Sequence, residues 1–277
     1  MSIKDLIFYK MQSLGNDYIY IDCIIKNYNI QDLSKYVSML SNRNFGIGGD
    51  GVVFISKKNH QYYMDMYNSD GSYSKVCGNA FRCVAYLLYY LGYSNRYCEI
   101  QSQQLQIKAK VLDNDIVKIY LPYQKQDFIK QSITILDKTF EYYYIDIGNP
   151  HCVILYKNNL DELDVNLYGQ EITKMVDLFC NGVNIEFYQV LESNKLRMRV
   201  YERGAGETLS CGSGACAIAL VYNYLFNPQS VIEVDSKGGS LYINILENEI
   251  ELTGLVEIVY KGLINLEKYN EKILGIL

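Results

Sequence analysis

The sequence contains no tryptophan, three prolines and only two histidines among its 277 residues. It has eight cysteines but no Cys-x-x-Cys pair, and His60 and His151 lie far apart without the spacing of metal ligands. Structural zinc sites are built from such closely spaced cysteine and histidine pairs. The pattern therefore argues against a metal site.

Long apolar runs are also missing. No stretch approaches the roughly eighteen apolar residues that cross a membrane, and the first residues contain no uninterrupted apolar core of a signal peptide. The net charge of −5 argues against nucleic acid as a main partner. We therefore expect a cytoplasmic protein with no membrane and no nucleic-acid partner.

Most of the eight cysteines need no special role. Disulfide frameworks belong to short secreted chains, whereas this chain is long and expected to be cytoplasmic. Six cysteines are most simply small residues of the core or the surface: Cys23, Cys83, Cys98, Cys152, Cys180 and Cys216. Cys77 and Cys211 differ because each immediately precedes a long apolar segment that is typical of a helix.

These two segments, 78–91 and 212–226, are apolar on nearly every face, which predicts helices buried in a core. Shorter apolar or alternating segments predict strands at 52–55, 104–111, 116–121, 142–147, 152–156, 197–201 and 240–245. Each half of the chain is therefore expected to form a curved, mainly antiparallel, barrel-like sheet around one central helix. This is an α+β fold.

The two halves also repeat a set of landmarks. The cysteines are 134 residues apart, and three other features recur in the same order at an offset of 133 or 134. They are the polar loops at 68–71 and 202–206, the Gly-Asn pairs at 15–16 and 148–149, and the loops ending at Asp50 and Asn184. We interpret the chain as two pseudo-symmetric domains with equivalent loops facing a cleft.

The first N–H groups of a helix have no partner within it and carry the positive end of the helix dipole. A cysteine there is biased toward thiolate, and a carboxylate can dock beside it. Two such thiols suit the inversion of a stereocentre next to a carboxylate, where one base removes the α-hydrogen and an acid returns a proton on the opposite face. Convergent N–H groups would stabilise the enolate-like charge without a cofactor.

The same motifs resemble the diaminopimelate epimerase family. They are SLGNDYIYID, FGIGGDG, NSDGSYSKVCGNAFRC, GNPHCVI, GVNIEF and RVYERGAGETLSCGSGACA, in the family's order, followed by TGLVEIVYKGLINL. The resemblance implies two similar domains, and the interconversion of LL- and meso-diaminopimelate without a cofactor in lysine and peptidoglycan-precursor synthesis. A homodimer is an expectation from the resemblance alone.

The resemblance also implies residue roles. Cys77 and Cys211 would be the two acid/base residues, with their pKa values adjusted by His151 and Glu202. Gly78, Asn79, Gly212 and Ser213 would hold the carboxylate at the reacting centre. The substrate site would be lined by Asn16, Asn68, Asn149, Asn184, Glu202 and Arg203. Asparagines and one arginine are suited to a distal head that carries both ammonium and carboxylate.

Departures from the family pattern are few. Gly51 stands where some members have a glutamine, and Glu186 replaces a glycine that is often seen between Ile and Phe. They leave open a related racemase acting on histidine or another amino acid, although the retained Asn149, Asn184 and Arg203 argue against it. From another class, the paired cysteines could belong to a non-catalytic redox protein.

Domain boundaries are expected near Leu121-Pro122 and Lys261-Gly262. The first domain would comprise residues 1–121 together with 263–277, which by resemblance return to complete it. The second domain would comprise residues 122–262. Each is long enough to bury its own core.

Overall fold

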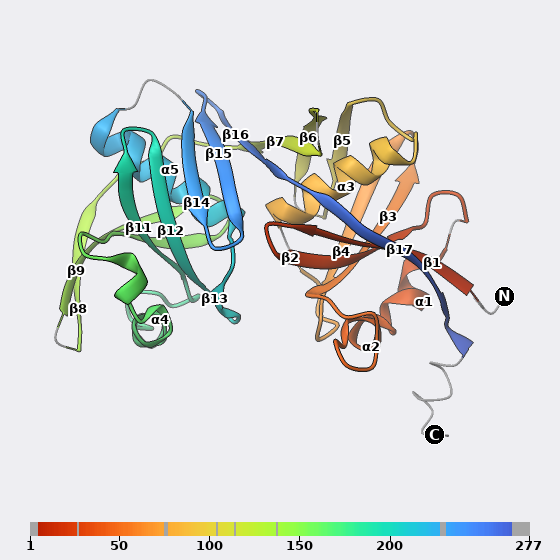
Figure 1. The fold of residues 1–277 in the computed structure, drawn as a ribbon, viewed down its shortest axis with the longest axis horizontal. Helices are drawn as coiled ribbons and strands as arrows, with labels where there is room; N and C mark the ends of the chain where they lie inside the picture. The colour runs from red at the N-terminus through yellow and green to blue at the C-terminus, as the bar shows by residue number, and fades with distance from the viewer. Residues whose placement is uncertain are drawn as a thin grey trace. The chain divides into compact units, whose positions relative to one another are not determined.

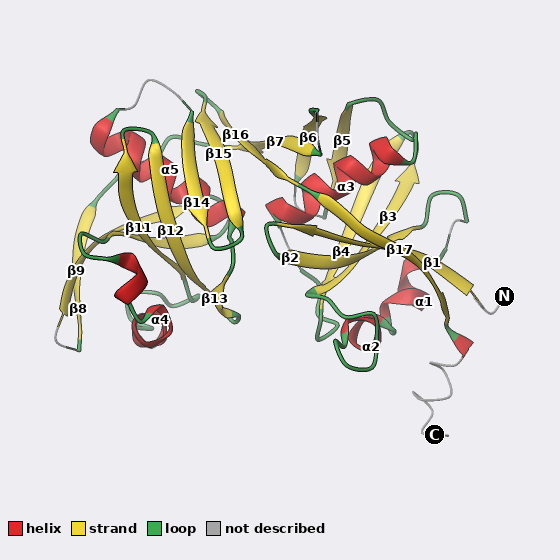
Figure 2. Ribbon diagram, viewed as in Figure 1, coloured by secondary structure: helices red, strands yellow, loops and turns green. Residues whose placement is uncertain are grey.

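The computed structural model describes residues 5–26, 28–74, 77–103, 105–113, 115–136, 138–227 and 231–267. They belong to two compact units, the first formed by 1–119 with 255–277 and the second by 120–254 (Figures 1 and 2). Several positions used above lie outside the described residues, namely 1–4, Lys75, Val76, Gln104, Pro228 and 268–277.

The first unit contains a sheet with both antiparallel and parallel neighbours. Its strands are β1 (Asp5–Ser13), β2 (Asn16–Asp22), β3 (Gly51–Lys58), β4 (Gln61–Asn68), β5 (Tyr97–Gln101), β6 (Gln106–Val111) and β17 (Glu257–Asn265). β17 pairs antiparallel with β1, and β1 with β2. The pair β2–β3 is parallel, β3–β4 antiparallel, β4–β5 parallel and β5–β6 antiparallel.

The second unit has the same order of pairings. Its strands are β8 (Lys130–Ile135), β9 (Lys138–Asp146), β10 (Pro150–Leu155), β11 (Asn184–Glu192), β12 (Lys195–Glu202), β13 (Gly206–Thr208), β14 (Ile232–Ser236), β15 (Gly239–Ile245) and β16 (Glu249–Leu255). β8–β9–β10 are antiparallel, β10–β11 parallel, β11–β12 antiparallel, β12–β14 parallel and β14–β15–β16 antiparallel. The short β13 pairs with β12.

One helix forms the centre of each unit. α3 (Gly78–Tyr90) contacts β1 and β2 as well as β5 and β6, so the sheet curves around it. α5 (Gly212–Phe226) contacts β9, β10, β11, β14 and β15 in the same manner. Both helices begin where the apolar segments of the sequence begin. The α+β class with one buried helix in each half is confirmed.

Smaller elements cover the sheets. They are α1 (Ile30–Ser34), α2 (Val37–Ser41), the 3₁₀ helix η1 (Leu160–Glu162) and α4 (Val165–Thr173). The side chain of Asp164 caps α4 by accepting a hydrogen bond from the Leu167 N–H. None of these elements was expected from the sequence, because five-residue helices and a nine-residue amphipathic one give weak periodic signals.

The repeat is visible in the strand register. In the first unit Tyr18 is opposite Gly51 across β2–β3, and in the second His151 is opposite Asn184 across β10–β11. Opposite residues are 33 positions apart in both units, so the two strand pairs have the same register. At an offset of 134, His151 corresponds to Asp17, which directly precedes Tyr18, and Asn184 corresponds to Asp50, which directly precedes Gly51. The two units therefore contain equivalent backbone positions that carry different side chains.

The chain passes between the units within β7 (Ile116–Pro122) and again at the end of β16. The chain returns to the first unit at Leu255, eight residues before the predicted boundary at residue 263. The reason is the pairing of β17 with β1, which begins at Glu257 opposite Gln12.

Three thiols that the fold shields from water, Cys23, Cys83 and the partly buried Cys98, make the stability of the fold depend on pH in the alkaline range. Burial raises the pKa of Cys23 and Cys83 to about 12, and burial likewise raises that of Cys98 to about 12. An unfolded cysteine titrates near about 8.5, so above that pH the unfolded chain loses protons that the folded chain retains. The stabilisation is complete below about pH 8.5 and declines as the pH rises toward 12.

We therefore expect the free energy of unfolding to fall steadily between about pH 8.5 and about pH 11. Urea unfolding under reducing conditions, followed by circular dichroism across that range, measures the change. Equal stability at the two ends of the range would contradict the assignment of these thiols to the folded core.

Candidate functional site

Each central helix begins at one of the two singled-out cysteines. Cys77 is the N-cap of α3 and Cys211 is the N-cap of α5, both with extended backbone geometry (φ −143° and −124°). The N–H groups of Gly78, Asn79, Gly212 and Ser213 therefore lie in the first turn, where such groups have no helical partner. A carboxylate beside either cysteine would meet N–H donors and the positive end of a helix dipole.

In the first unit, Cys77 is linked to a chain of hydrogen bonds. Its Sγ lies 3.4 Å from Asn16 Oδ1, and the Asn16 amide donates to Asp50 Oδ2 at 3.0 Å. The Asp17 backbone N–H donates to the same Asp50 oxygen at 3.2 Å. Asp50 thus fixes the amide of Asn16 so that its oxygen faces the thiol. In the sequence, Asp50 marks only the end of a repeated loop, and no role in the site was predicted for it.

An ion network supports that aspartate. Arg43 bridges Asp17 and Asp50 with Nη–Oδ distances of 2.6 and 2.8 Å, and Lys10 binds Asp17 from the other side. Burial by itself would raise the pKa of Asp17, but the hydrogen bonds from Arg43 and Lys10 outweigh this effect and lower the pKa. Burial and the nearby Asp17 charge raise the pKa of Asp50. The network holds the loop before β3 against β1 and β2.

Asn79 is oriented by a buried arginine. The Arg82 guanidinium is fully buried and donates to Asn79 Oδ1 and, at 2.7 Å, to Ser13 Oγ. With its oxygen engaged by Arg82, the Asn79 amide presents its NH₂ group as the remaining donor. The sequence shows Arg82 as a polar residue within an apolar helix, but its partners depend on the fold.

Asn68 ends β4 and forms part of a tight turn. Its backbone N–H donates to Ser72 O at 2.8 Å, and its Nδ2 donates to Ser72 Oγ at 3.0 Å. Gly71 has φ +88°, a conformation that favours glycine. The polar loop expected from the sequence is therefore a hydrogen-bonded turn on the first unit.

In the second unit, Cys211 is buried, and its Sγ accepts the Gly214 N–H at 3.4 Å and lies 3.4 Å from Ser213 Oγ. Burial, followed by the charges of Glu202 and Glu186, raises the pKa of Cys211 well above its ordinary value. Desolvation and two carboxylates therefore oppose, at Cys211, the bias toward thiolate that the helix N-terminus favours. Together they favour the protonated form of this thiol.

Glu202 is close to this thiol. Burial raises the pKa of Glu202, and the negative charge of Glu186 adds to the rise, while hydrogen bonds from Thr208 and Cys211 partly offset it. The Thr208 hydroxyl donates to Glu202 Oε1 at 2.5 Å. The second unit therefore combines a thiol and a carboxyl group whose pKa values are both raised.

His151 is fully buried and pairs with a residue that the sequence analysis did not select. Its Nδ1 lies 2.7 Å from Oε1 of Glu186, which is also fully buried. A Cβ atom added to Gly214 would lie 2.6 Å from the same oxygen, so the first turn of α5 packs directly on this carboxylate. The sequence marked Glu186 only as a departure from the family pattern.

The remaining predicted residues of this unit form one loop cluster. Asn184 Nδ2 donates to Pro150 O at 3.2 Å, and its Oδ1 accepts the Arg203 N–H at 3.0 Å. The Arg203 guanidinium donates to Asn181 O. Asn149 follows Gly148 (φ +95°) in the turn before β10. The structure thus gathers Asn184 and Arg203 with the turn at Pro150.

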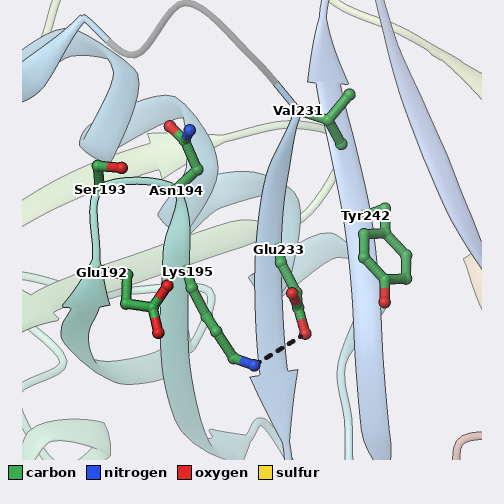
Figure 3. A pocket seen from close by; sticks show the side chains of 7 residues that line it. All are labelled: Glu192, Ser193, Asn194, Lys195, Val231, Glu233 and Tyr242. Atoms are coloured by element: carbon green, nitrogen blue, oxygen red, sulfur yellow. Dashed lines mark ion pairs between the residues drawn. The ribbon is translucent and has the colours of Figure 1, made fainter.

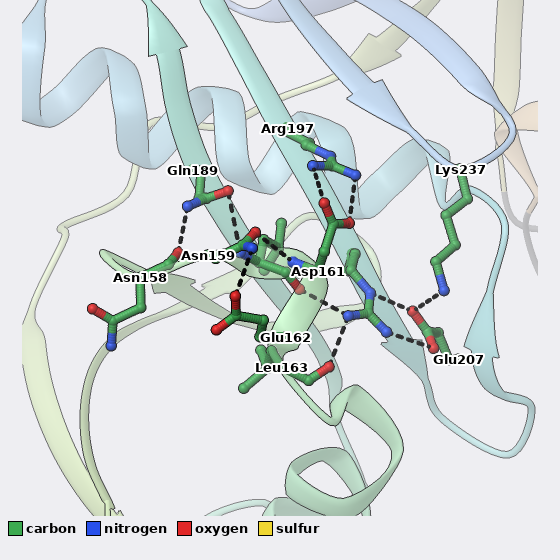
Figure 4. A network of polar contacts seen from close by, with 11 residues as sticks. Asn158, Asn159, Asp161, Glu162, Leu163, Gln189, Arg197, Glu207 and Lys237 are labelled. Carbon is green, nitrogen blue, oxygen red and sulfur yellow. Dashed lines mark hydrogen bonds and ion pairs between the residues drawn. The ribbon is translucent and has the colours of Figure 1, made fainter.

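The segment between Glu202 and Cys211 is anchored by a second polar network (Figure 4). Arg199 binds Glu207 through two N–O pairs of 2.7 and 3.0 Å and donates to the carbonyl oxygens of Leu160 and Leu163. Lys237 also reaches Glu207, at 2.7 Å. An exposed pair, Arg197 with Asp161, lies beside it.

A surface hollow of about 370 Å³ lies elsewhere on the second unit (Figure 3). It is lined by Glu192, Ser193, Asn194, Lys195, Val231, Glu233 and Tyr242. Lys195 and Glu233 form an ion pair of 3.5 Å across it. It contains none of the predicted site residues.

Among the residues that the structure describes, no cluster of three or more His, Cys, Asp or Glu side chains is suited to hold a metal ion. None of the helices in the described ranges has both the length and the apolar character that crossing a membrane requires.

The partly buried Arg199–Glu207 pair can be tested against its exposed neighbour. We expect Arg199→Met to cost about 3 kcal/mol of unfolding free energy, because it leaves Glu207 and two carbonyl oxygens with fewer partners. Arg197→Met, which breaks the exposed pair, should cost less than about 1 kcal/mol. Urea unfolding of both variants measures the difference, and equal costs would contradict an anchoring role for Arg199.

Comparison with known proteins adds an independent finding. The diaminopimelate epimerase family model matches residues 8–121 and 143–262. The chain is 37% identical to the diaminopimelate epimerase of Leptospira biflexa, covering 92% of this chain and 97% of that protein. It is 35% identical to that of Carboxydothermus hydrogenoformans, covering 92% and 98%.

Solved structures show the fold alone. A phenazine biosynthesis protein of the PhzF family from Enterococcus faecalis aligns with a TM-score of 0.74 at 16% identity, covering 95% of this chain and 100% of that one.

Proposed function

Because this chain belongs to the diaminopimelate epimerase family, we propose that it is an isomerase that interconverts LL- and meso-2,6-diaminopimelate. The observation that carries the proposal is the pair of cysteine N-caps, one at the start of each central helix. The product would serve lysine and peptidoglycan-precursor synthesis, and the site of action would be the cytoplasm.

The inversion needs one thiolate and one thiol. The thiolate removes the α-hydrogen as a proton, and the electron pair of the C–H bond moves into the carboxylate to give an enolate-like intermediate. The thiol then donates its proton to the opposite face of the same carbon, so the two sulfurs exchange protonation states. No electrons are gained or lost.

The surroundings of Cys211 favour one distribution of roles. Since burial and neighbouring carboxylates favour the protonated form of Cys211, it would be the proton donor, and Cys77 would remove the α-hydrogen in that direction. After that transfer Cys211 is the thiolate and Cys77 the thiol, so the reverse reaction would run with the two roles exchanged, with the Glu202 carboxyl close to Cys211. The two halves are thus alike in backbone and different in charge.

Backbone N–H groups supply the electrostatic stabilisation. Removing the α-hydrogen places negative charge on the carboxylate oxygens, and N–H donors at Gly78-Asn79 and Gly212-Ser213 would bind that charge as it develops. The Asn79 amide, turned by Arg82, adds an NH₂ donor in the first unit.

The distal amino-acid head requires acceptors for ammonium and donors for carboxylate. We propose that the substrate site is lined by Asn16, Asn68, Asn149, Asn184, Glu202 and Arg203, and that several of these residues read the distal head. Asn184 and Arg203 are already joined by a hydrogen bond, so they would act as one unit in reading that head. Their charge and hydrogen-bonding pattern would decide which stereocentre reaches the cysteines.

The substrate is tested by α-hydrogen exchange in deuterated water under reducing conditions. We expect deuterium to enter diaminopimelate and neither histidine nor proline. Exchange into histidine or proline in place of diaminopimelate would indicate a racemase of different specificity. The absence of exchange with all three would refute the enzymatic proposal.

The two-thiol scheme is tested by single substitutions. Cys77→Ser and Cys211→Ser should each lower the rate of epimerisation by about 10² to 10⁴-fold, because a hydroxyl is a far weaker acid than a thiol and is not ionised near neutral pH, so it neither donates nor accepts the proton efficiently. Cys180→Ser is the matched control, since Cys180 is exposed and has no assigned role. Full epimerase activity in either of the first two variants would refute the scheme.

A further inference from the structure

The Glu186–His151 pair is unusual because both side chains are fully buried. Glu186 lies on β11 and His151 on the neighbouring parallel strand β10, and their side chains meet at 2.7 Å between Nδ1 and Oε1. Burying such groups is costly even when they are paired, so a pair of this kind is weak evidence for stability and a candidate for function.

Half of this pair's hydrogen-bonding capacity is unused within the protein. His151 Nε2 and Glu186 Oε2 are buried and have no hydrogen-bond partner among the described residues. Buried polar atoms in folded proteins are nearly always satisfied. In His151, one ring nitrogen, Nδ1, contacts a carboxylate, and the other, Nε2, has no partner within the described residues. A carboxylate orients an acid–base histidine in this way in a Ser-His-Asp triad.

The location connects the pair to the proposed chemistry. The Glu186 carboxylate lies against Gly214, whose N–H donates to the Cys211 sulfur. Glu186 and His151 both act electrostatically on Glu202, and Glu186 acts on Cys211 as well. The pair is therefore next to the groups that hold and move the proton in the second unit.

The internal repeat shows that the fold does not need this pair. At an offset of 134, Glu186 corresponds to Val52, which is opposite Ile19 in β2 as Glu186 is opposite Val153 in β10. Val52 is a buried apolar residue of the first unit's core. An apolar side chain thus fits the equivalent position of the first unit, and the carboxylate is found at this position only in the second unit.

We propose that Glu186 is a positioning residue: it holds His151 in the tautomer protonated at Nδ1, so that Nε2 is the nitrogen that exchanges protons with the reacting groups. The Nδ1–H donates to Glu186, and the hydrogen bond of one ring nitrogen sets the state of the other. The expected effect on catalysis rests on the proposed function, whereas the prediction that His151 is protonated at Nδ1 does not depend on that function.

The tautomer can be read directly by ¹⁵N NMR of histidine-labelled protein. The chain has only two histidines, and His60, in the β3–β4 turn, serves as an internal reference. In the unaltered protein we expect a protonated Nδ1 and an unprotonated Nε2 for His151. A His151 protonated at Nε2 alone would overturn the proposal, whatever the enzymatic activity.

Glu186→Gln removes the carboxylate while keeping the side-chain shape. Since an amide can donate as well as accept, we expect the His151 nitrogen shifts to move toward a mixture of tautomers. We also expect α-hydrogen exchange into diaminopimelate to slow by about 10- to 100-fold. Glu192→Gln is the matched control, because Glu192 is an exposed carboxylate on the same strand, and it should change neither readout.

A double-variant cycle separates positioning from a purely structural effect. If Glu186 acts through His151, the further slowing caused by Glu186→Gln in a His151→Gln background should shrink to less than about twofold. An equal loss in both backgrounds, or unchanged His151 shifts and exchange in Glu186→Gln, would overturn the proposal.

Two further results are also decisive. If Glu186→Gln does not fold, the spectrum of the unaltered protein still decides the tautomer, and Glu186→Asp, which retains a carboxylate, should keep the Nδ1–H form. If the unaltered protein does not exchange the α-hydrogen of diaminopimelate, the proposed function is refuted. The tautomer of His151 is then still decided by the NMR measurement alone.

Discussion

The burial of one apolar helix at the centre of each sheet is the constraint on which the other features depend. α3 and α5 have few polar side chains, so each is stable only where strands surround it. Enclosure by strands on several sides fixes the direction of the helix axis and therefore the position of its first turn. Because Cys77 and Cys211 are the residues at which these helices begin, helix burial places each thiol beside unpaired N–H groups.

The surroundings of the two thiols differ in charge although the backbones are equivalent. Around Cys77, the aspartates are balanced by Arg43 and Lys10, and the neutral amide of Asn16 contacts the sulfur. Around Cys211, burial and then the charges of Glu202 and Glu186 raise the pKa of the thiol. The proposed reaction, which needs one thiol and one thiolate at the same time, would use this difference, because two identical environments would favour the same protonation state in both.

Much of the candidate site could be predicted from the sequence because local signals mark it. An apolar run that starts directly after a cysteine specifies both a buried helix and its first residue, and glycine-asparagine loops mark turns. The residues that orient the site could not be predicted in the same way. Asp50, Arg82 and Glu186 contact residues that are 34, 3 and 35 positions away. Even the three-residue separation gave no signal, since whether Arg82 is buried against Asn79 or exposed depends on packing.

The sequence by itself determined the α+β class, the repeat, the two cysteines and the absence of a zinc-type ligand pattern. These follow from residue order and periodicity, which are properties of the chain before it folds. Only the tertiary structure decided the direction in which the pKa of Cys211 is shifted and the pairing of His151 with Glu186. Both depend on removal from water and on carboxylates brought in from other strands, and desolvation outweighed the helix N-terminus that the sequence alone favoured.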